Sequence, residues 1–114
     1  MNFSYKIKKD NNFIHISFVG NLMNKQQVQD LLGEIEFHSN EGFNKIIIDL
    51  SAMKYMNSTG LNILINIFTQ TRSKGGDVII TNIPEKIKKL LVITKLNSIF
   101  NIEETVDKAK KVLI

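Results

Sequence analysis

The sequence contains no cysteine and only one proline among its 114 residues. Without cysteine the chain can form no disulfide, no thiol nucleophile and no thiolate metal site. No apolar run approaches the roughly 18 residues that a membrane-spanning helix requires, and the first residues lack the apolar core of a signal peptide. We therefore expect a globular protein of the cytoplasm, with no membrane as a partner.

Positive charge is in excess, but it is not gathered in one place. The 15 Lys and Arg residues exceed the 11 acidic ones by four, and most lysines fall in three clusters, at residues 6–9, 86–89 and 108–111. Acidic residues lie among the last two clusters, and no aromatic residues are interleaved with the lysines. A nucleic-acid surface needs a continuous basic patch. The lysines therefore indicate solvated helix faces, and we expect no direct contact with nucleic acid.

Two periods divide the chain into strands and helices. Apolar residues alternate with polar ones at residues 3–7 and 14–18, which predicts two strands joined by a tight antiparallel hairpin. From Asn24 to about Gly42 the apolar residues recur every three or four positions, as on one face of a helix. The continuous apolar runs at residues 45–50 and 77–81 are typical of strands covered on both faces.

The segment between the two apolar strands has the length and period of a helix, from about Ser58 to Lys74. Strand, helix and strand in this order predict a parallel βαβ unit with a right-handed crossover. Pro84 suits the first turn of another helix, a short strand is expected near residues 99–102, and a helix should close the chain. The sequence thus predicts one α/β domain over residues 1–114. A mixed sheet, with an antiparallel hairpin and then parallel βαβ units, should pack with about four helices.

The polar stretch "YMNSTGL", residues 55–61, stands where the apolar strand passes into the central helix. Ser58 directly precedes the helical period, so we expect its side chain to cap the helix. Gly60 lies one turn inside, where glycine costs about 1 kcal/mol relative to alanine. A residue without Cβ is therefore expected to allow the close approach of another backbone or of a partner. The spaced glycines and lysine of a phosphate-binding loop are absent.

The stretch "IIIDLSAMKYMNSTGLNILINIF" resembles the signature of the STAS domain and, within that family, of the anti-sigma factor antagonists. The resemblance extends to "GNL" at residues 20–22 and to "IPEKIKKLLVITKLNSIFNI". It implies a STAS-like fold and a partner switch in which Ser58 is the phosphoacceptor. An anti-sigma factor that is itself a serine protein kinase would bind the unphosphorylated chain and phosphorylate Ser58. A phosphoserine phosphatase would be a further partner. Ser58 would then be a substrate and not a catalyst, so the resemblance implies no enzyme, no cofactor and no metal.

The resemblance also implies a partner-binding surface around Ser58. Its expected members are Asn21, Asn24, Asn57, Ser58, Thr59, Gly60 and Leu61. Two features depart from the family: Asn57 stands where Asp usually precedes the serine, and Met23 and Asn24 stand where many relatives carry an acid. A STAS module that binds partners without phosphorylation, as a scaffold, is therefore the alternative function. Thr59 is an alternative acceptor.

The remaining polar residues do not form a catalytic pattern in the sequence. His15 falls on the polar side of the second strand and His38 near the end of the first helix, so neither forms an evident set with Ser58. No spacing of residues predicts a metal site. Asp49 is expected to end the central strand and to accept hydrogen bonds from N–H groups of the following loop.

Overall fold

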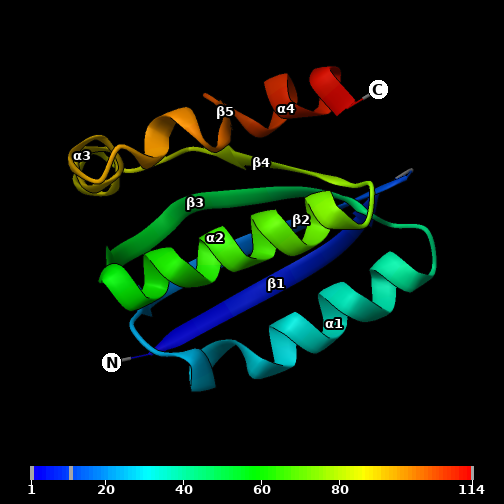
Figure 1. The fold of residues 1–114 in the computed structure, drawn as a ribbon, viewed down its shortest axis with the longest axis horizontal. Coiled ribbons are helices and arrows are strands. Elements are labelled where there is room, and N and C mark those ends of the chain that lie inside the picture. Colours follow the sequence, from blue (N-terminus) through cyan, green and yellow to red (C-terminus); the bar gives the residue numbers. More distant parts are fainter. Residues whose placement is uncertain (1, 11, 114) are drawn as a thin grey trace.

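The computed structural model describes residues 2–10 and 12–113, apart from the side chain of residue 113 (Figure 1). These residues form one sheet in the order β1-β2-β3-β4-β5. The strands are β1 (Phe3–Asp10), β2 (Phe13–Leu22), β3 (Lys45–Met56), β4 (Asp77–Thr81) and β5 (Asn101–Glu103). The predicted hairpin turn includes residue 11, and the predicted domain includes residues 1 and 114, all three of which lie outside the described residues.

The sheet is mixed, as the sequence predicts. β1 and β2 pair antiparallel, with Asp10 opposite Phe13, and the three other neighbouring pairs are parallel. β3 is the central strand, and its apolar run is buried on both faces because parallel strands of this kind are covered on both sides. The expected α/β class is therefore confirmed.

Four α-helices lie in the described part of the chain, in agreement with the prediction. They are α1 (Gln29–Asn40), α2 (Ser58–Ser73), α3 (Glu85–Ile93) and α4 (Val106–Leu113), with short 3-10 helices η1 (Lys25–Val28) and η2 (Leu96–Ser98). α1, α2 and α3 bury apolar side chains in the main core. α4 contributes Ala109 to a second, smaller cluster on the other face of the sheet, with Phe13, Ile47 and Ile79. Figure 1 shows α1 and α2 on one side of the sheet and α4 beyond β4.

Several predicted boundaries are wrong by a few residues. β3 continues beyond Asp49 to Met56, because its second half still pairs with β2, up to Leu22 opposite Met56. The helix expected from Asn24 is divided into η1 and α1. Pro84 precedes the first residue of α3 and does not lie inside its first turn, and the last strand is shifted to Asn101–Glu103.

Gly60 lets α2 begin directly against the end of β2. A Cβ atom at this position would overlap the Leu22 carbonyl oxygen and would lie 2.7 Å from Cγ of Met56. The close backbone approach expected at Gly60 is therefore present, and its neighbour is the chain itself. Because β2 and β3 end side by side at Leu22 and Met56, this contact fixes the position of the helix start over both strand ends.

We predict that Gly60→Ala lowers the free energy of unfolding by about 1–3 kcal/mol, since overpacking outweighs the gain in helix propensity. Gly33→Ala is the matched control, because Gly33 lies within α1 with nothing within 4 Å of the added Cβ atom. That variant should be stabilised by up to about 1 kcal/mol. Urea denaturation measures both. Equal stabilisation of the two variants would show that the contact at Leu22 yields without cost.

Candidate functional site

Ser58 is the first residue of α2 and follows the end of β3 by two positions. The junction of β3 and α2 lies at the left of Figure 1. Ser58 and Thr59 are both exposed. Within the described residues, the Ser58 hydroxyl makes no hydrogen bond, and the N–H groups of Ser58 and Thr59 have no backbone or side-chain acceptor. The hydroxyl is therefore free to react or to contact a partner.

The helix is capped by Asn57, and the prediction that Ser58 is the cap is wrong. Asn57 has extended backbone angles, and its Oδ1 atom accepts a hydrogen bond of 2.9 Å from the N–H of Gly60. The N–H of Leu61 donates to the Asn57 carbonyl oxygen at 2.9 Å. Asn and Ser are about equally good caps, so the sequence alone left the position of the cap ambiguous by one residue.

The other end of the Asn57 amide holds the chain that follows β2. Its Nδ2 atom donates to the Met23 carbonyl oxygen at 3.2 Å, and its backbone N–H lies 3.4 Å from the Leu22 carbonyl oxygen. An amide can accept from Gly60 and donate to Met23 at once, whereas an ionised Asp could only accept. The amide at position 57, where the family usually has Asp, is thus required for the bond to Met23, whereas the bond from Gly60 needs only an acceptor.

The turn after β2 is built by Gln27. Its Oε1 atom accepts from the N–H groups of Met23 and Asn24, while its Nε2 atom donates to the Asn21 carbonyl oxygen. Asn24 in turn caps η1 by accepting from the Gln27 N–H. This reciprocal capping box has the N-x-x-Q spacing that is visible in the sequence, and this spacing is the signal that marks the start of η1.

The structure brings most of the predicted surface together. Asn24, Ser58 and Thr59 are exposed, and Asn21 and Asn57 are half-buried, on two segments that the bond from Asn57 to Met23 joins. Leu61 is different, because its side chain is 3 % exposed and packs in the main core. It therefore supports the surface from beneath and cannot offer a side-chain contact, which corrects its assignment as a contact residue.

A hollow that sequence reasoning missed lies next to Ser58. It has a volume of about 400 Å³, and its lining consists of Lys54, Tyr55, Met56, Asn57, Ser58, Lys86, Ile87 and Leu90. These residues come from the end of β3, the start of α2 and the first two turns of α3. The sequence gives little indication of this hollow, because its lining comes from two segments, residues 54–58 and 86–90, that are far apart in the chain. Only the packing of α3 beside the end of β3 unites them.

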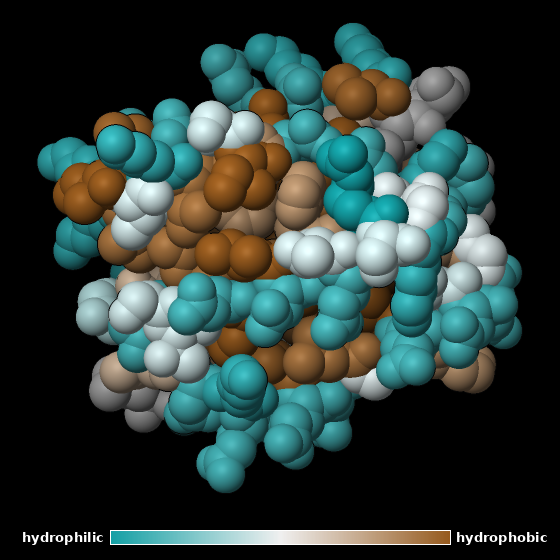
Figure 2. All heavy atoms as spheres, viewed as in Figure 1, coloured by the Kyte–Doolittle hydropathy of each residue, from teal (hydrophilic) through white to brown (hydrophobic). Residues whose placement is uncertain are grey.

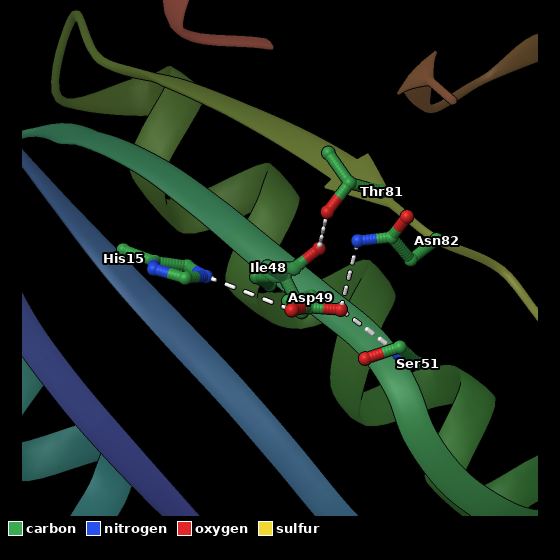
Figure 3. A network of polar contacts seen from close by, with 6 residues as sticks. All are labelled: His15, Ile48, Asp49, Ser51, Thr81 and Asn82. Carbon is green, nitrogen blue, oxygen red and sulfur yellow. Dashed lines mark hydrogen bonds and ion pairs between the residues drawn. The ribbon is translucent and has the colours of Figure 1, made fainter. Parts of the chain in front are cut away.

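Asp49 forms a second polar group, away from Ser58, on the side of β3 opposite to the main core (Figure 3). Its Oδ1 atom accepts from the Ser51 N–H at 2.9 Å and from the Asn82 side-chain amide at 3.2 Å. Nε2 of His15 lies 3.8 Å from its Oδ2 atom. The expectation that Asp49 accepts N–H bonds is right in kind, but the donor belongs to β3 itself and not to the loop before α2.

The hydrogen bonds around Asp49 set its acidity. Partial burial by itself would raise the pKa of this carboxyl group, but the backbone and side chain of Ser51, the Asn82 amide and the charge of His15 outweigh burial. The pKa of Asp49 is therefore below its ordinary value. A carboxylate held in this way is a structural acceptor that connects β2, β3 and Asn82, the residue directly after β4.

The described residues do not bring the histidines to Ser58. His15 contacts Asp49, and Nδ1 of His38 lies 3.9 Å from a carboxylate oxygen of Glu41. In residues 2–10 and 12–113, no group of three or more His, Cys, Asp or Glu side chains is placed to hold a metal ion. Across the same residues, none of the helices has both the length and the apolar character needed to cross a membrane.

Comparison with known proteins gives one consistent result. Residues 5–109 match the STAS domain family. A Thermotoga maritima protein described as an anti-sigma factor antagonist is 33 % identical over 70 residues, which is 61 % of this chain and 62 % of that protein. The match thus spans less than two thirds of that relative. The anti-sigma-B factor antagonist of Bacillus subtilis is 26 % identical over 102 residues, or 90 % of this chain and 92 % of its own.

A solved structure shares the fold of this chain. The Bacillus cell fate determinant SpoIIAA, in its phosphorylated form, has a TM-score of 0.75 and 15 % sequence identity, and covers 97 % of this chain and 100 % of that chain. At this identity the likeness is one of fold.

We predict that Asn57→Ala lowers the free energy of unfolding by about 2 kcal/mol, because it removes a helix cap and a hydrogen bond between segments, each of about 1 kcal/mol. Asn57→Asp should fall between this variant and the wild type, since it keeps the acceptor, loses the donor and regains about 0.3–1 kcal/mol from the helix dipole. Urea denaturation measures the free energy of unfolding of each variant and so gives their order of stability. Asn62→Ala, at an exposed position of α2, is the control and should not be destabilised. Equal stability of the two Ala variants would contradict the role assigned to Asn57.

A second prediction concerns Asp49 and pH. Its pKa is lowered in the folded chain, so its contribution is present above the unfolded value, near 3.8, and is lost as the pH falls through the folded value. Asp49→Asn should therefore cost about 1 kcal/mol near pH 7, the difference between charged and neutral hydrogen bonds. The difference from the wild type should shrink below about pH 4 in unfolding curves. The exposed control Glu36→Gln should show little change, and a pH-independent effect of Asp49→Asn would refute the electrostatic explanation.

Proposed function

Since this chain belongs to the STAS domain family, we propose that it is an anti-sigma factor antagonist that acts by partner switching. In this proposal the unphosphorylated chain binds an anti-sigma factor of the serine-kinase type, in the cytoplasm, and so frees a sigma factor. Phosphorylation of Ser58 releases the complex, and a phosphoserine phosphatase restores it. The names of the relatives as anti-sigma factor antagonists support this choice.

The observation that carries the proposal is the division of roles between Asn57 and Ser58. Asn57 supplies the cap of α2 and the bond to Met23. The adjacent Ser58 is exposed and its hydroxyl bonds to no described residue. A phosphate on Ser58 would therefore break no interaction of the fold. This is the arrangement that a reversible modification requires.

The expected energies agree with a switch that leaves the fold intact. Phosphoserine adds about −1.5 to −2 charges, and the start of a helix favours a negative charge by about 0.3–1 kcal/mol. The free N–H groups of Ser58 and Thr59 lie at that helix start. In an interface, however, the same phosphate must lose its water or meet like charge, which costs several kcal/mol. A micromolar complex has only about 8 kcal/mol of binding free energy, so such a cost would abolish it in practice.

The amide at position 57 also favours the alternative function, a STAS module that binds partners without phosphorylation. A kinase that recognises an acid before the serine would find an amide in this chain. The two bonds of Asn57 explain why the fold accepts an amide there, and they leave kinase recognition to experiment.

We expect the wild type and Ser58→Ala to bind the same anti-sigma factor with affinities within about threefold. Stoichiometric phosphorylation of the wild type should weaken binding at least 100-fold. The assay incubates the purified chain with ATP and each serine-kinase anti-sigma factor of the same genome. Intact mass and phosphopeptide analysis locate the phosphate, and calorimetry measures the affinity. Ser58→Glu should bind weakly to the extent that a carboxylate imitates phosphate.

Thr59→Ala is the control for the neighbouring hydroxyl and should still be phosphorylated and released. A phosphate found on Thr59 instead would move the acceptor by one residue. Binding that does not change on phosphorylation of Ser58 would exclude the switch. Binding without any phosphorylation, with every kinase tried, would establish the unphosphorylated module in its place.

A further inference from the structure

The hollow beside Ser58 is lined by two lysines, and we refer to it as the lysine hollow. Its lining includes Lys54 and Lys86 but no Asp or Glu. Both lysines are exposed, and within residues 2–10 and 12–113 neither forms an ion pair, whereas Lys88, also on α3, pairs with Glu85 at 3.9 Å. Two lysines without an ion-pair partner among these residues therefore line the same hollow as the proposed phosphoacceptor.

The lysine hollow also offers apolar surface. Tyr55 is 50 % exposed, Leu90 is partly exposed, and Ile87 is buried at its base. Figure 2 shows apolar side chains at the surface in the region of α3, on the left, with hydrophilic side chains beside them. An apolar base with a cationic rim is complementary to a peptide that carries an apolar side chain flanked by carboxylates.

We propose that the lysine hollow receives an acidic segment of the anti-sigma factor, and that the phosphate on Ser58 competes with this segment for Lys54 and Lys86. This inference rests on the proposed function and specifies the chemistry of the partner. It also agrees with the neutral side chain of Asn57, which lines the hollow, because an acid at this position would weaken the attraction of a basic hollow for an acidic partner.

The size of the lysine hollow favours a protein segment over a nucleic acid. Nucleic-acid binding draws its affinity from many phosphate contacts along a basic stripe. Here the lining supplies two lysines around a volume of about 400 Å³, which suits one or two side chains of a peptide. The single aromatic residue, Tyr55, has no second aromatic beside it in the lining to form a stacking surface.

The charges explain how phosphorylation would release such a partner. Ser58 lines the same hollow as the two lysines. A phosphate of about −1.5 to −2 charges would nearly neutralise them and would repel the carboxylates of the bound segment. Phosphorylation therefore removes the attraction between the lysines and the acidic segment and adds a repulsion between the phosphate and that segment. Neither effect needs a change in the backbone.

The first test uses the anti-sigma factor that binds Ser58→Ala in the assay above. The double variant Lys54→Glu, Lys86→Glu should bind this factor at least tenfold more weakly than the wild type. Lys74→Glu, Lys111→Glu is the matched control with the same change in net charge. Its residues are exposed and lie at the far end of α2 and on α4, so its affinity should stay within threefold. Thermal unfolding verifies that both double variants fold.

The second test needs no partner. The chain is produced with phosphoserine at position 58, and the second pKa of the phosphate, about 6 for free phosphoserine, is followed by ³¹P NMR. In the wild type it should be lower than in Lys54→Gln, Lys86→Gln, because the lysines favour the dianion. In Lys74→Gln, Lys111→Gln it should equal the wild-type value. Identical titrations in all three proteins would overturn the competition.

The outcomes separate this inference from the function on which it rests. If no serine-kinase anti-sigma factor binds the wild type, the proposed function fails and the acidic-segment proposal fails with it. If a factor binds, phosphorylation releases it, and the Lys54 and Lys86 variants bind like the wild type, the function stands and only the lysine hollow is refuted. Selective loss in the Lys54→Glu, Lys86→Glu variant, together with the shifted phosphate titration, establishes both.

Discussion

The side chain of Asn57 holds the junction on which the candidate site depends. One amide group accepts from the first turn of α2 and donates to the chain that leaves β2. It therefore fixes the helix start and the turn at residues 21–24 relative to one another. Gly60 acts with it, because the missing side chain lets the helix rest on the Leu22 carbonyl group. Asn57 and Gly60 thus fix the backbone that carries the Ser58 hydroxyl.

Within four consecutive residues, 57–60, this junction separates the groups that hold the fold from an exposed hydroxyl. Asn57 carries the bonds, Gly60 permits the contact, and Ser58 between them contributes its backbone to the helix but no side-chain bond among the described residues. The polar group around Asp49 lies on the opposite face of the sheet, where it connects β2, β3 and the residue directly after β4. The two polar groups therefore join different parts of the fold.

The sequence predicts the architecture well because its signals are local. Unbroken apolar runs identify β3 and β4, alternation identifies the hairpin, and a period of 3.6 identifies α1 and α2. One failure has a local cause, and the others arise from contacts between segments that are distant in the chain. Asn57 and Ser58 are equivalent caps by type, and the second half of β3 lacks an apolar run, so its pairing with β2 is not visible in the pattern. The bond from Asn57 to Met23 and the union of Lys54 with Lys86 join distant segments. They depend on how the elements pack, which no period in the sequence reports.

The free hydroxyl of Ser58 has a consequence for the amount of protein in the cell. Proteases of the cell remove chains according to how often they unfold. If modification of Ser58 leaves the cap and the core unchanged, and the helix start favours the added negative charge, the modified chain should unfold no more often than the unmodified chain. It should then be degraded no faster, so modification would change the state of the pool without depleting it. A population of this protein could be reset many times within the lifetime of one molecule.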